Sequence, residues 1–138
     1  MTATNNLTEK SSSLSPMSFL VVDEDEDIGP AIQTIIQDTG NNAQLETDAH
    51  AALERLTSHE CPYQGLFLDT NINSLTAFLL SLREKNTRIP ITLIDTNDVF
   101  LESQRREFGI TTYIEKPFSS LDIQLAVNEM QKVVLENK

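Results

Sequence analysis

Carboxylates follow three of the short apolar runs in this sequence, and they are the side chains best suited to chemistry. Asp23 and Glu24 follow FLVV, Asp69 ends GLFLD, and Asp95 ends ITLID. Carboxylates that gather in one place repel one another, which suggests a divalent cation among them, and Mg²⁺ prefers oxygen ligands. A carboxylate that faces a bound cation can also attack a phosphoryl group and form an acyl phosphate. These residues therefore indicate a site for Mg²⁺ and phosphate chemistry, provided that the fold brings them together.

The spacing of apolar residues predicts the elements that would do so. Short apolar runs typical of buried strands alternate with stretches in which apolar residues recur at helical spacing. The expected strands cover residues 19–22, 43–47, 65–69, 91–95 and 111–116. The expected helices cover 28–40, 48–56 (capped by Asp48), 75–82, the less regular 99–109, and a last stretch to Val134 that opens with a capping pair, Ser119 and Asp122. Five such repeats predict an α/β fold, a doubly wound five-stranded parallel sheet with helices on both faces.

This fold would gather the carboxylates at one edge of the sheet. In open parallel sheets the site lies beyond the carboxyl ends of the strands. Asp23, Glu24, Asp69 and Asp95 would then lie at the same edge, and Lys116, after the fifth strand, would reach it. The acids at 25–27 would belong to the loop and the first helical turn, where the helix dipole favours negative charge.

Length, composition and charge limit the classes of function. With 138 residues and a formal net charge of −11, the chain is not expected to bind nucleic acid or an anionic membrane directly, because both need a basic face. The sequence has no apolar run long enough to span a membrane and no N-terminal secretory pattern. Its one cysteine, Cys61, fits the reducing cytoplasm. Residues 1–17 are polar and predicted to be a disordered tail, which leaves 18–138 as one domain.

The order of these motifs resembles the receiver domain of two-component response regulators over roughly residues 18–135. FLVVDEDEDI is similar to the first strand and acidic pair of that family, GLFLD to its third strand, and YIEKPF to its closing motif. The resemblance implies a flavodoxin-like fold in which Asp69 is the phospho-acceptor and Lys116 contacts the phosphoryl group. It further implies that Tyr113 is an aromatic that changes rotamer on activation. In the family, the residue at Pro117 is often preceded by a cis peptide bond.

The resemblance also implies a set of Mg²⁺ ligands. Asp23 and Glu24 match the acidic pair at the end of the first strand, and Asp69 would share the ion. Asn71, two residues further on, matches the position whose backbone carbonyl completes the protein's part of the metal shell.

Two positions depart from the family pattern. The family carries Thr or Ser at the end of the fourth strand, where the hydroxyl bonds the phosphoryl group, and this chain has Asp95. An ionised carboxylate has no proton to donate and would repel a phosphoryl dianion. A register shifted by one residue would place Thr96 there, but Ile94 is the last apolar residue of the run, which favours Asp95. In the loop after Asp69, Asn73 stands where the family favours proline.

The leading expectation is a stand-alone receiver whose only reactions of its own are slow self-phosphorylation and autodephosphorylation. It would take a phosphoryl group onto Asp69 from a sensor histidine kinase or a histidine phosphotransfer protein. Because nothing after Lys138 could serve as an output domain, the signal would pass to a downstream protein. The surface for it would be the face of the fourth helix, fifth strand and fifth helix, and a homodimer through that face is left open.

Two other functions are considered. One is a pseudo-receiver, a protein-binding module that works without phosphoryl transfer, in which Asp95 could pair with Lys116 and hold a constitutive state. The other is a phosphohydrolase of the haloacid-dehalogenase type, because residues 23–25 fit its D-x-D motif. The chain is short for that fold and lacks a later acidic pair in the right place, so this last function is disfavoured.

Overall fold

The computed structural model describes residues 16–86, 88–95 and 102–136, in which five strands alternate with five helices. The strands are β1 (Ser18–Val22), β2 (Asn42–Glu46), β3 (Gly65–Asp69), β4 (Ile91–Asp95) and β5 (Thr112–Glu115). The helices are α2 (Ile28–Asp38), α3 (Ala49–Leu56), α4 (Leu75–Lys85), α5 (Glu102–Glu107) and α6 (Ser120–Glu136). All four strand pairings are parallel, in the order β2-β1-β3-β4-β5. This confirms the predicted doubly wound α/β fold of the flavodoxin-like receiver type.

The central strands form where apolar residues stand in unbroken succession. Phe19, Leu20, Val21 and Val22 of β1 are each at most 1% exposed. Neighbouring residues of a strand point to opposite faces, so both faces of this strand are covered. Strands of this type are expected in a parallel sheet, whose crossover helices pack on both sides. The expected bounds of β3 and β4 agree with the structure residue for residue.

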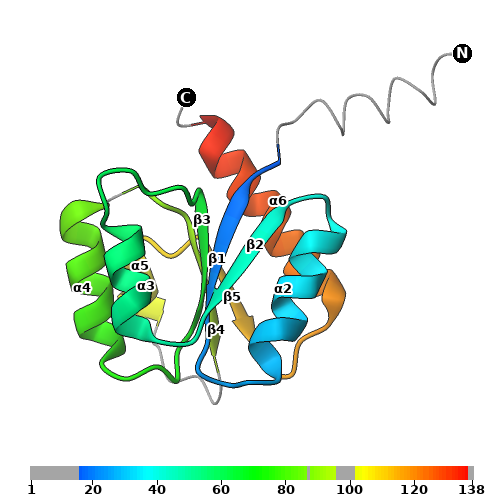
Figure 1. Cartoon of the computed structure of the whole chain (residues 1–138), viewed down its shortest axis with the longest axis horizontal. Helices are drawn as coiled ribbons and strands as arrows, with labels where there is room; N and C mark the ends of the chain where they lie inside the picture. The colour runs from blue at the N-terminus through cyan, green and yellow to red at the C-terminus, as the bar shows by residue number, and fades with distance from the viewer. Residues whose placement is uncertain (1–15, 87, 96–101, 137–138) are drawn as a thin grey trace, which may run out of the picture.

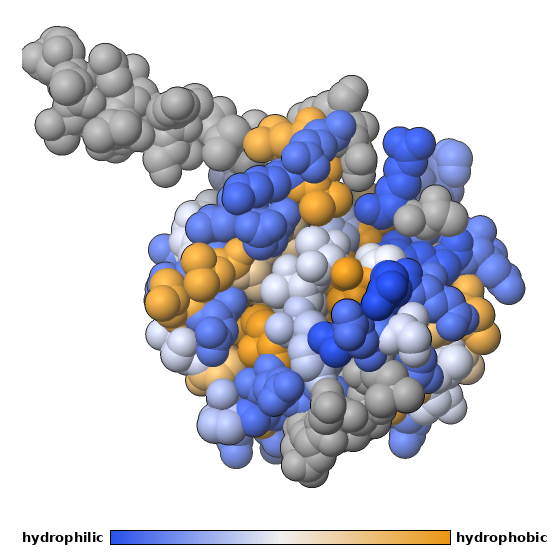
Figure 2. Space-filling model, turned by 180° about the vertical axis from the view of Figure 1, so that it is seen from behind, coloured by the Kyte–Doolittle hydropathy of each residue, from blue (hydrophilic) through white to orange (hydrophobic). Residues whose placement is uncertain are grey.

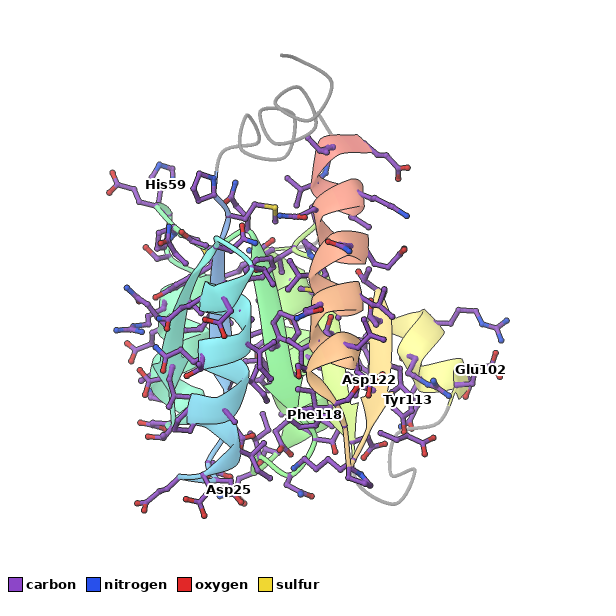
Figure 3. All side chains as sticks on the ribbon, turned by 90° about the vertical axis from the view of Figure 1, so that its right-hand side faces the viewer. Asp25, His59, Glu102, Tyr113, Phe118 and Asp122 are labelled. Carbon is purple, nitrogen blue, oxygen red and sulfur yellow. The ribbon has the colours of Figure 1, made fainter. Side chains whose placement is uncertain are left out.

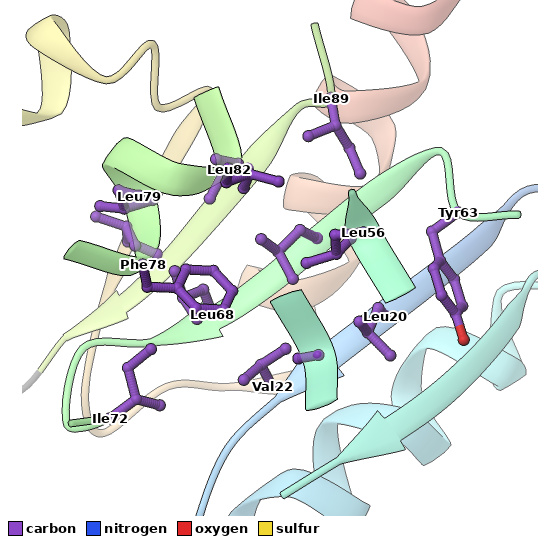
Figure 4. Close-up of a cluster of buried hydrophobic side chains, with 14 of the residues drawn as sticks. Leu20, Val22, Leu56, Tyr63, Leu68, Ile72, Phe78, Leu79, Leu82 and Ile89 are labelled. Carbon is purple, nitrogen blue, oxygen red and sulfur yellow. The ribbon is translucent and has the colours of Figure 1, made fainter. Parts of the chain in front are cut away.

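The helices pack in two layers, with α2 and α6 on one face of the sheet and α3, α4 and α5 on the other (Figure 1). Successive side chains of a strand point alternately into the two layers. The layer under α3 and α4 is the larger cluster, shown in Figure 4; it contains Leu20, Val22, Leu66, Leu68, Leu56, Phe78, Leu79 and Leu82. The opposite layer contains Phe19, Val21, Phe67, Ile32, Ile36, Ile123, Val127 and Met130. The rings of Phe19 and Phe67 meet edge to face with their centroids 5.7 Å apart.

The helix ends agree with the signals in the sequence. The Asp48 carboxylate accepts a hydrogen bond of 3.0 Å from the backbone N–H of His50 at the start of α3. Before α6, the Asp122 carboxylate accepts from the Ser119 N–H at 2.9 Å, and the Ser119 hydroxyl accepts from the Asp122 N–H at 3.3 Å. Gly40 follows the end of α2 with a φ of +89°, a left-handed conformation that glycine adopts without strain.

Helix α5 is the element that the sequence predicts least well. A helix is expected over 99–109, and the structure has one from Glu102 to Glu107; residues 96–101 lie outside the described part of the chain. None of the six residues of α5 is buried. Its C-terminal end is fastened instead by Arg83 of α4, whose guanidinium donates to the backbone carbonyls of Phe108 at 2.8 Å and Gly109 at 3.1 Å.

The described part of the chain begins near the end of the predicted tail, at residue 16. Residues 1–15 of that tail lie outside the described part of the chain. Met17 is 6% exposed, its N–H donates to the Asn41 side chain at 2.8 Å, and its carbonyl accepts from the Asn42 N–H at 2.8 Å. Among the helices described, none combines the length and the apolar character that crossing a membrane requires.

Replacement of Gly65 tests how closely β1 and β3 approach α6. A Cβ at this position would lie 2.5 Å from a ring carbon of Phe19 and 2.9 Å from the Met130 methyl group. We expect Gly65→Ala to lower the free energy of unfolding by about 1–3 kcal/mol, as overpacking of a filled core does. Urea unfolding followed by circular dichroism measures it, with the exposed α6 substitution Gln124→Ala as a control. Equal midpoints for the two variants would contradict this packing.

Candidate functional site

The carboxyl ends of the strands bring three acids to one edge of the sheet. Asp23 directly follows β1, and Asp69 and Asp95 are the last residues of β3 and β4. Asp23 and Asp69 are each 2% exposed, and Asp95 is fully buried. Figure 3 shows Asp25, from the loop after β1, at the end of the molecule opposite to His59. Burial of charged groups is unfavourable unless each finds a partner, so the partners define what the edge can do.

Asp69 is held by two donors. Its Oδ2 pairs with the Lys116 ammonium at 2.5 Å, and its Oδ1 accepts from the backbone N–H of Asn71 at 2.7 Å. Lys116 lies just after β5, and its side chain is 16% exposed, so it approaches the carboxylate from the solvent side. The peptide bond between Lys116 and Pro117 is cis, the isomer often found at this point in receivers. The pair places a nucleophilic oxygen beside a cation that an incoming anion can also contact.

The two oxygens of Asp23 differ in their partners. Its Oδ1 accepts from the backbone N–H of Asp25 at 2.8 Å, whereas its buried Oδ2 accepts no hydrogen bond from any residue that the structure describes. Burial, and next the charge of nearby Asp69, raise the pKa of Asp23 to about 6, against the opposing effects of the Asp25 N–H and Lys116. An oxygen that is buried, unpartnered and next to a second carboxylate fits a hard divalent cation, which would satisfy it and separate the two charges.

The acids at 25–27 all precede α2; the expectation that they extend into its first helical turn is wrong, because the helix begins at Ile28 and its first turn contains no acidic residue. The Asp25 carboxylate accepts from the backbone N–H groups of Asp27 at 2.7 Å and Ile28 at 3.0 Å and so organises the start of α2. These bonds, that from Ile28 first, lower the pKa of Asp25. Glu24 is exposed and lines a groove of about 350 Å³ with Asp48 before α3, with His50 of α3 and with residues of α4.

The structure therefore brings Asp23, Asp69 and Lys116 together and leaves Glu24 outside this group. Within the described ranges 16–86, 88–95 and 102–136, no cluster of three or more acidic, histidine or cysteine side chains is close enough to hold a metal ion. The oxygen donors available to a cation at this edge are thus the two carboxylates of Asp23 and Asp69 and nearby backbone carbonyls.

Asp95 is held by hydroxyl groups. The Thr70 hydroxyl donates to its Oδ1 at 2.6 Å, and the Tyr113 hydroxyl donates to its Oδ2 at 2.5 Å. Asp95 pairs with Glu115 in the ladder between β4 and β5, so it is the last residue of its strand, and Thr96 lies outside the described residues. The Arg105 guanidinium lies over the Tyr113 ring, 3.8 Å from the centroid.

Thr70 and Arg105 were not predicted from the sequence to belong to this site. Arg105 offered no signal, because one arginine on a short exposed helix is common. Thr70 offered a weak one, since it is a hydroxyl residue next to Asp69 in a chain with a carboxylate at the end of β4. The pairing of β3 with β4 brings the two together, and the Thr70 N–H donates to the Ile94 carbonyl at 3.0 Å.

Comparisons with known proteins agree with this geometry. The sequence profile of the response regulator receiver domain matches residues 19–128. No curated protein matches the chain significantly in sequence. Among solved structures, the chemotaxis response regulator CheY4 of Vibrio cholerae is similar, with a TM-score of 0.72 and 18% identity over 84% of this chain and 99% of that one.

Two further structures are similar. A CheY-like response regulator receiver domain protein from Methanospirillum hungatei has a TM-score of 0.75 and 16% identity over 88% of this chain and 99% of its own. NtrX from Brucella abortus has a TM-score of 0.76 and 23% identity over 88% of this chain but only 28% of its own. At these identities the structural similarity establishes the fold.

The pH dependence of stability tests the environment of Asp23. Its pKa of about 6 in the folded chain exceeds the ordinary value of about 4, so the folded state binds the proton more tightly and gains stability as the pH falls from 6 to 4. Asp23→Asn removes this titration and keeps the Oδ1 acceptor. Without divalent cations, we expect the variant to be more stable than the parent by about 1–2 kcal/mol near pH 7.5, with no advantage near pH 4.

Urea unfolding over this pH range measures the difference. Asp38→Asn, an exposed acid at the end of α2, is the control and should show no such pH-dependent advantage. If the Asp23→Asn advantage were constant between pH 4 and 7.5, the raised pKa would be refuted.

Proposed function

The chain belongs to the response regulator receiver domain family, and on this premise we propose that it accepts a phosphoryl group on Asp69 and signals by protein–protein contacts. The donor is a sensor histidine kinase or a histidine phosphotransfer protein. The observation that carries the proposal is the 2.5 Å ion pair of Lys116 with Asp69 at the carboxyl end of β3. Like receivers in general, the protein is a signalling molecule rather than an enzyme, with slow self-phosphorylation and autodephosphorylation as its only reactions.

The transfer uses the carboxylate of Asp69 as nucleophile. One of its oxygens attacks the phosphorus of a phosphohistidine; an O–P bond forms and the N–P bond breaks. The imidazole keeps the electron pair of the broken bond and leaves neutral, because its other nitrogen carries a proton. Lys116, which contacts Asp69 Oδ2 in the structure, supplies positive charge next to the new acyl phosphate.

Mg²⁺ is the cofactor that this edge of the sheet would hold. The carboxylates of Asp23 and Asp69 would bind it together with the backbone carbonyl of Asn71, and the buried Asp23 Oδ2 would gain the partner that it lacks. When bound, the ion offsets negative charge on the transferred group. Glu24 would have to leave its groove between α3 and α4 to join these ligands.

The face formed by α5, β5 and α6 is the proposed surface for a downstream protein. Leu121 and Leu125 on α6 are 59% and 53% exposed, and a groove of about 270 Å³ lies between β5 and α6. Seen from behind, the molecule carries separate hydrophobic patches between hydrophilic side chains (Figure 2). A homodimer would use the same face. We place the protein in the cytoplasm, in keeping with its free Cys61.

One observation favours a second function, that of a protein-binding module that works without phosphoryl transfer. Asp95 stands where receivers have a hydroxyl residue, and both of its carboxylate oxygens accept bonds from hydroxyl groups of the protein itself. An ionised carboxylate cannot donate to a phosphoryl oxygen. A carboxylate near the acceptor would also oppose the added negative charge.

Mass spectrometry of the intact protein distinguishes the two functions. After incubation with acetyl phosphate and Mg²⁺, we expect a phosphoryl adduct on the native chain and on the control Asp38→Asn, and none on Asp69→Asn, which lacks the nucleophile. An adduct that appears only in Asp95→Thr would show that Asp95 prevents the transfer, and the binding module would then be the function.

Mg²⁺ binding is tested separately from the transfer. A ligand at ten times its Kd stabilises the folded state by about 1.4 kcal/mol. We expect Mg²⁺ to raise the urea midpoint of the native chain and to leave that of the double variant Asp23→Asn, Asp69→Asn unchanged. An equal rise in both proteins would place the ion elsewhere.

A further inference from the structure

Asp95 combines full burial with hydrogen bonds from two different elements. Its side chain ends β4 with no exposed surface, and its two oxygens take one hydroxyl donor each. One donor, Thr70, directly follows the acceptor Asp69 at the end of β3, and the other, Tyr113, belongs to β5. The Asp95 carboxylate thus connects the end of β3, which carries the proposed phospho-acceptor Asp69, with β5 at the edge of the sheet.

Tyr113 is the residue whose position this connection determines. It is half-buried and packs against the cluster under α3 and α4, while its hydroxyl reaches the buried Asp95. The Arg105 guanidinium covers the ring at 3.8 Å, and the buried Arg105 Nε has no hydrogen-bond partner within the described part of the chain. The ring is therefore held at its tip by a carboxylate and on its face by a cation.

The same ring shapes the surface of the molecule. Tyr113 lines the groove of about 270 Å³ between β5 and α6 and a second groove of about 220 Å³ beside α5. In Figure 3 it lies between α5 and the start of α6, where Asp122 is labelled. Tyr113 is thus a lining residue of two grooves on the α5–β5–α6 face.

We propose that Asp95 is a positioning residue that fixes Tyr113 in its inward orientation in the resting chain, with Thr70 fixing Asp95 in turn. If the ring turned outward, Asp95 Oδ2 would lose a hydroxyl donor in a fully buried place, which is strongly unfavourable. The orientation of Tyr113 is consequently set before any phosphoryl transfer and without the Asp69 carboxylate. The α5–β5–α6 face is preset by the same contact. This inference holds or fails independently of the proposed phosphoryl transfer.

The two tyrosines of the chain allow a direct test, because the sequence contains no tryptophan. In a Tyr63→Phe background, Tyr113 is the only tyrosine, and its exposure is measured by acrylamide quenching of its fluorescence. We expect a low quenching constant in this background. Asp95→Val, which suits a buried strand, should raise the constant toward that of a free tyrosine derivative, and Asp95→Asn, which keeps an acceptor of the same length, should restore a low value.

Two matched variants separate positioning from general loosening. Thr112→Val removes a neighbouring buried hydroxyl that has no hydrogen-bond partner in residues 16–86, 88–95 and 102–136, and it should leave the constant low. Asp69→Asn, which removes the acceptor charge, should also leave it low. An unchanged constant in Asp95→Val, or a rise in Asp69→Asn equal to that in Asp95→Val, would overturn the proposal.

Circular dichroism establishes that each variant is folded. If Asp95→Val does not fold, Asp95→Thr takes its place, because its hydroxyl ends one bond short of the Asp95 carboxylate oxygens. A high constant in Asp95→Thr would support the proposal, and a constant as low as that of Asp95→Asn would overturn it.

Discussion

The structure depends on how one edge of a parallel sheet accommodates buried carboxylates. Asp23, Asp69 and Asp95 lie within a short segment of that edge, and each is almost completely removed from water. The charge of Asp69 is compensated by an ammonium group, and that of Asp95 by two hydroxyl groups. For Asp23 the compensation is incomplete, because one oxygen has no donor among the residues that the structure describes. The three buried carboxylates therefore differ in their partners, and the roles proposed for them follow from that difference.

The difference between Asp69 and Asp95 follows from the nature of their partners. Lys116 reaches Asp69 on a long, partly exposed side chain, so the contact can be exchanged for one to an incoming anion. The partners of Asp95 are short or rigid side chains that are themselves packed into the sheet and the adjoining cluster. The roles proposed for the two acids follow this difference: Asp69 reacts, and Asp95 maintains a conformation. A receiver that carries a hydroxyl at the second position has no such division of roles between two acids.

The sequence allowed most of the fold to be predicted, because the strands of this sheet are apolar without interruption and end in acids. The same pattern located Asp23, Asp69, Asp95 and Lys116 at one edge, as found. It could not show that Glu24 lines a groove beside α3, away from Asp23. A pattern of apolar and acidic residues does not distinguish two adjacent acids, and only the path of the loop after β1 separates them. Nor could it pair Thr70 with Asp95, a contact that depends on the register between β3 and β4. The bounds of helix α5 were poorly predicted for a related reason. None of its residues is buried, so its sequence has no apolar residues at helical spacing.

That property of α5 also affects its dynamics. None of its six residues is buried; its described contacts include the stacking of Arg105 on Tyr113 and, just beyond its C-terminal end, the Arg83 hydrogen bonds. Local opening of α5 would consequently expose little surface, and its amide hydrogens would exchange with a free energy that hardly changes with denaturant concentration. Opening of α6, which buries Ile123, Ala126, Val127 and Met130, would expose much more surface and depend steeply on denaturant. The proposed signalling face thus joins a helix that buries four residues in the core to a helix that buries none.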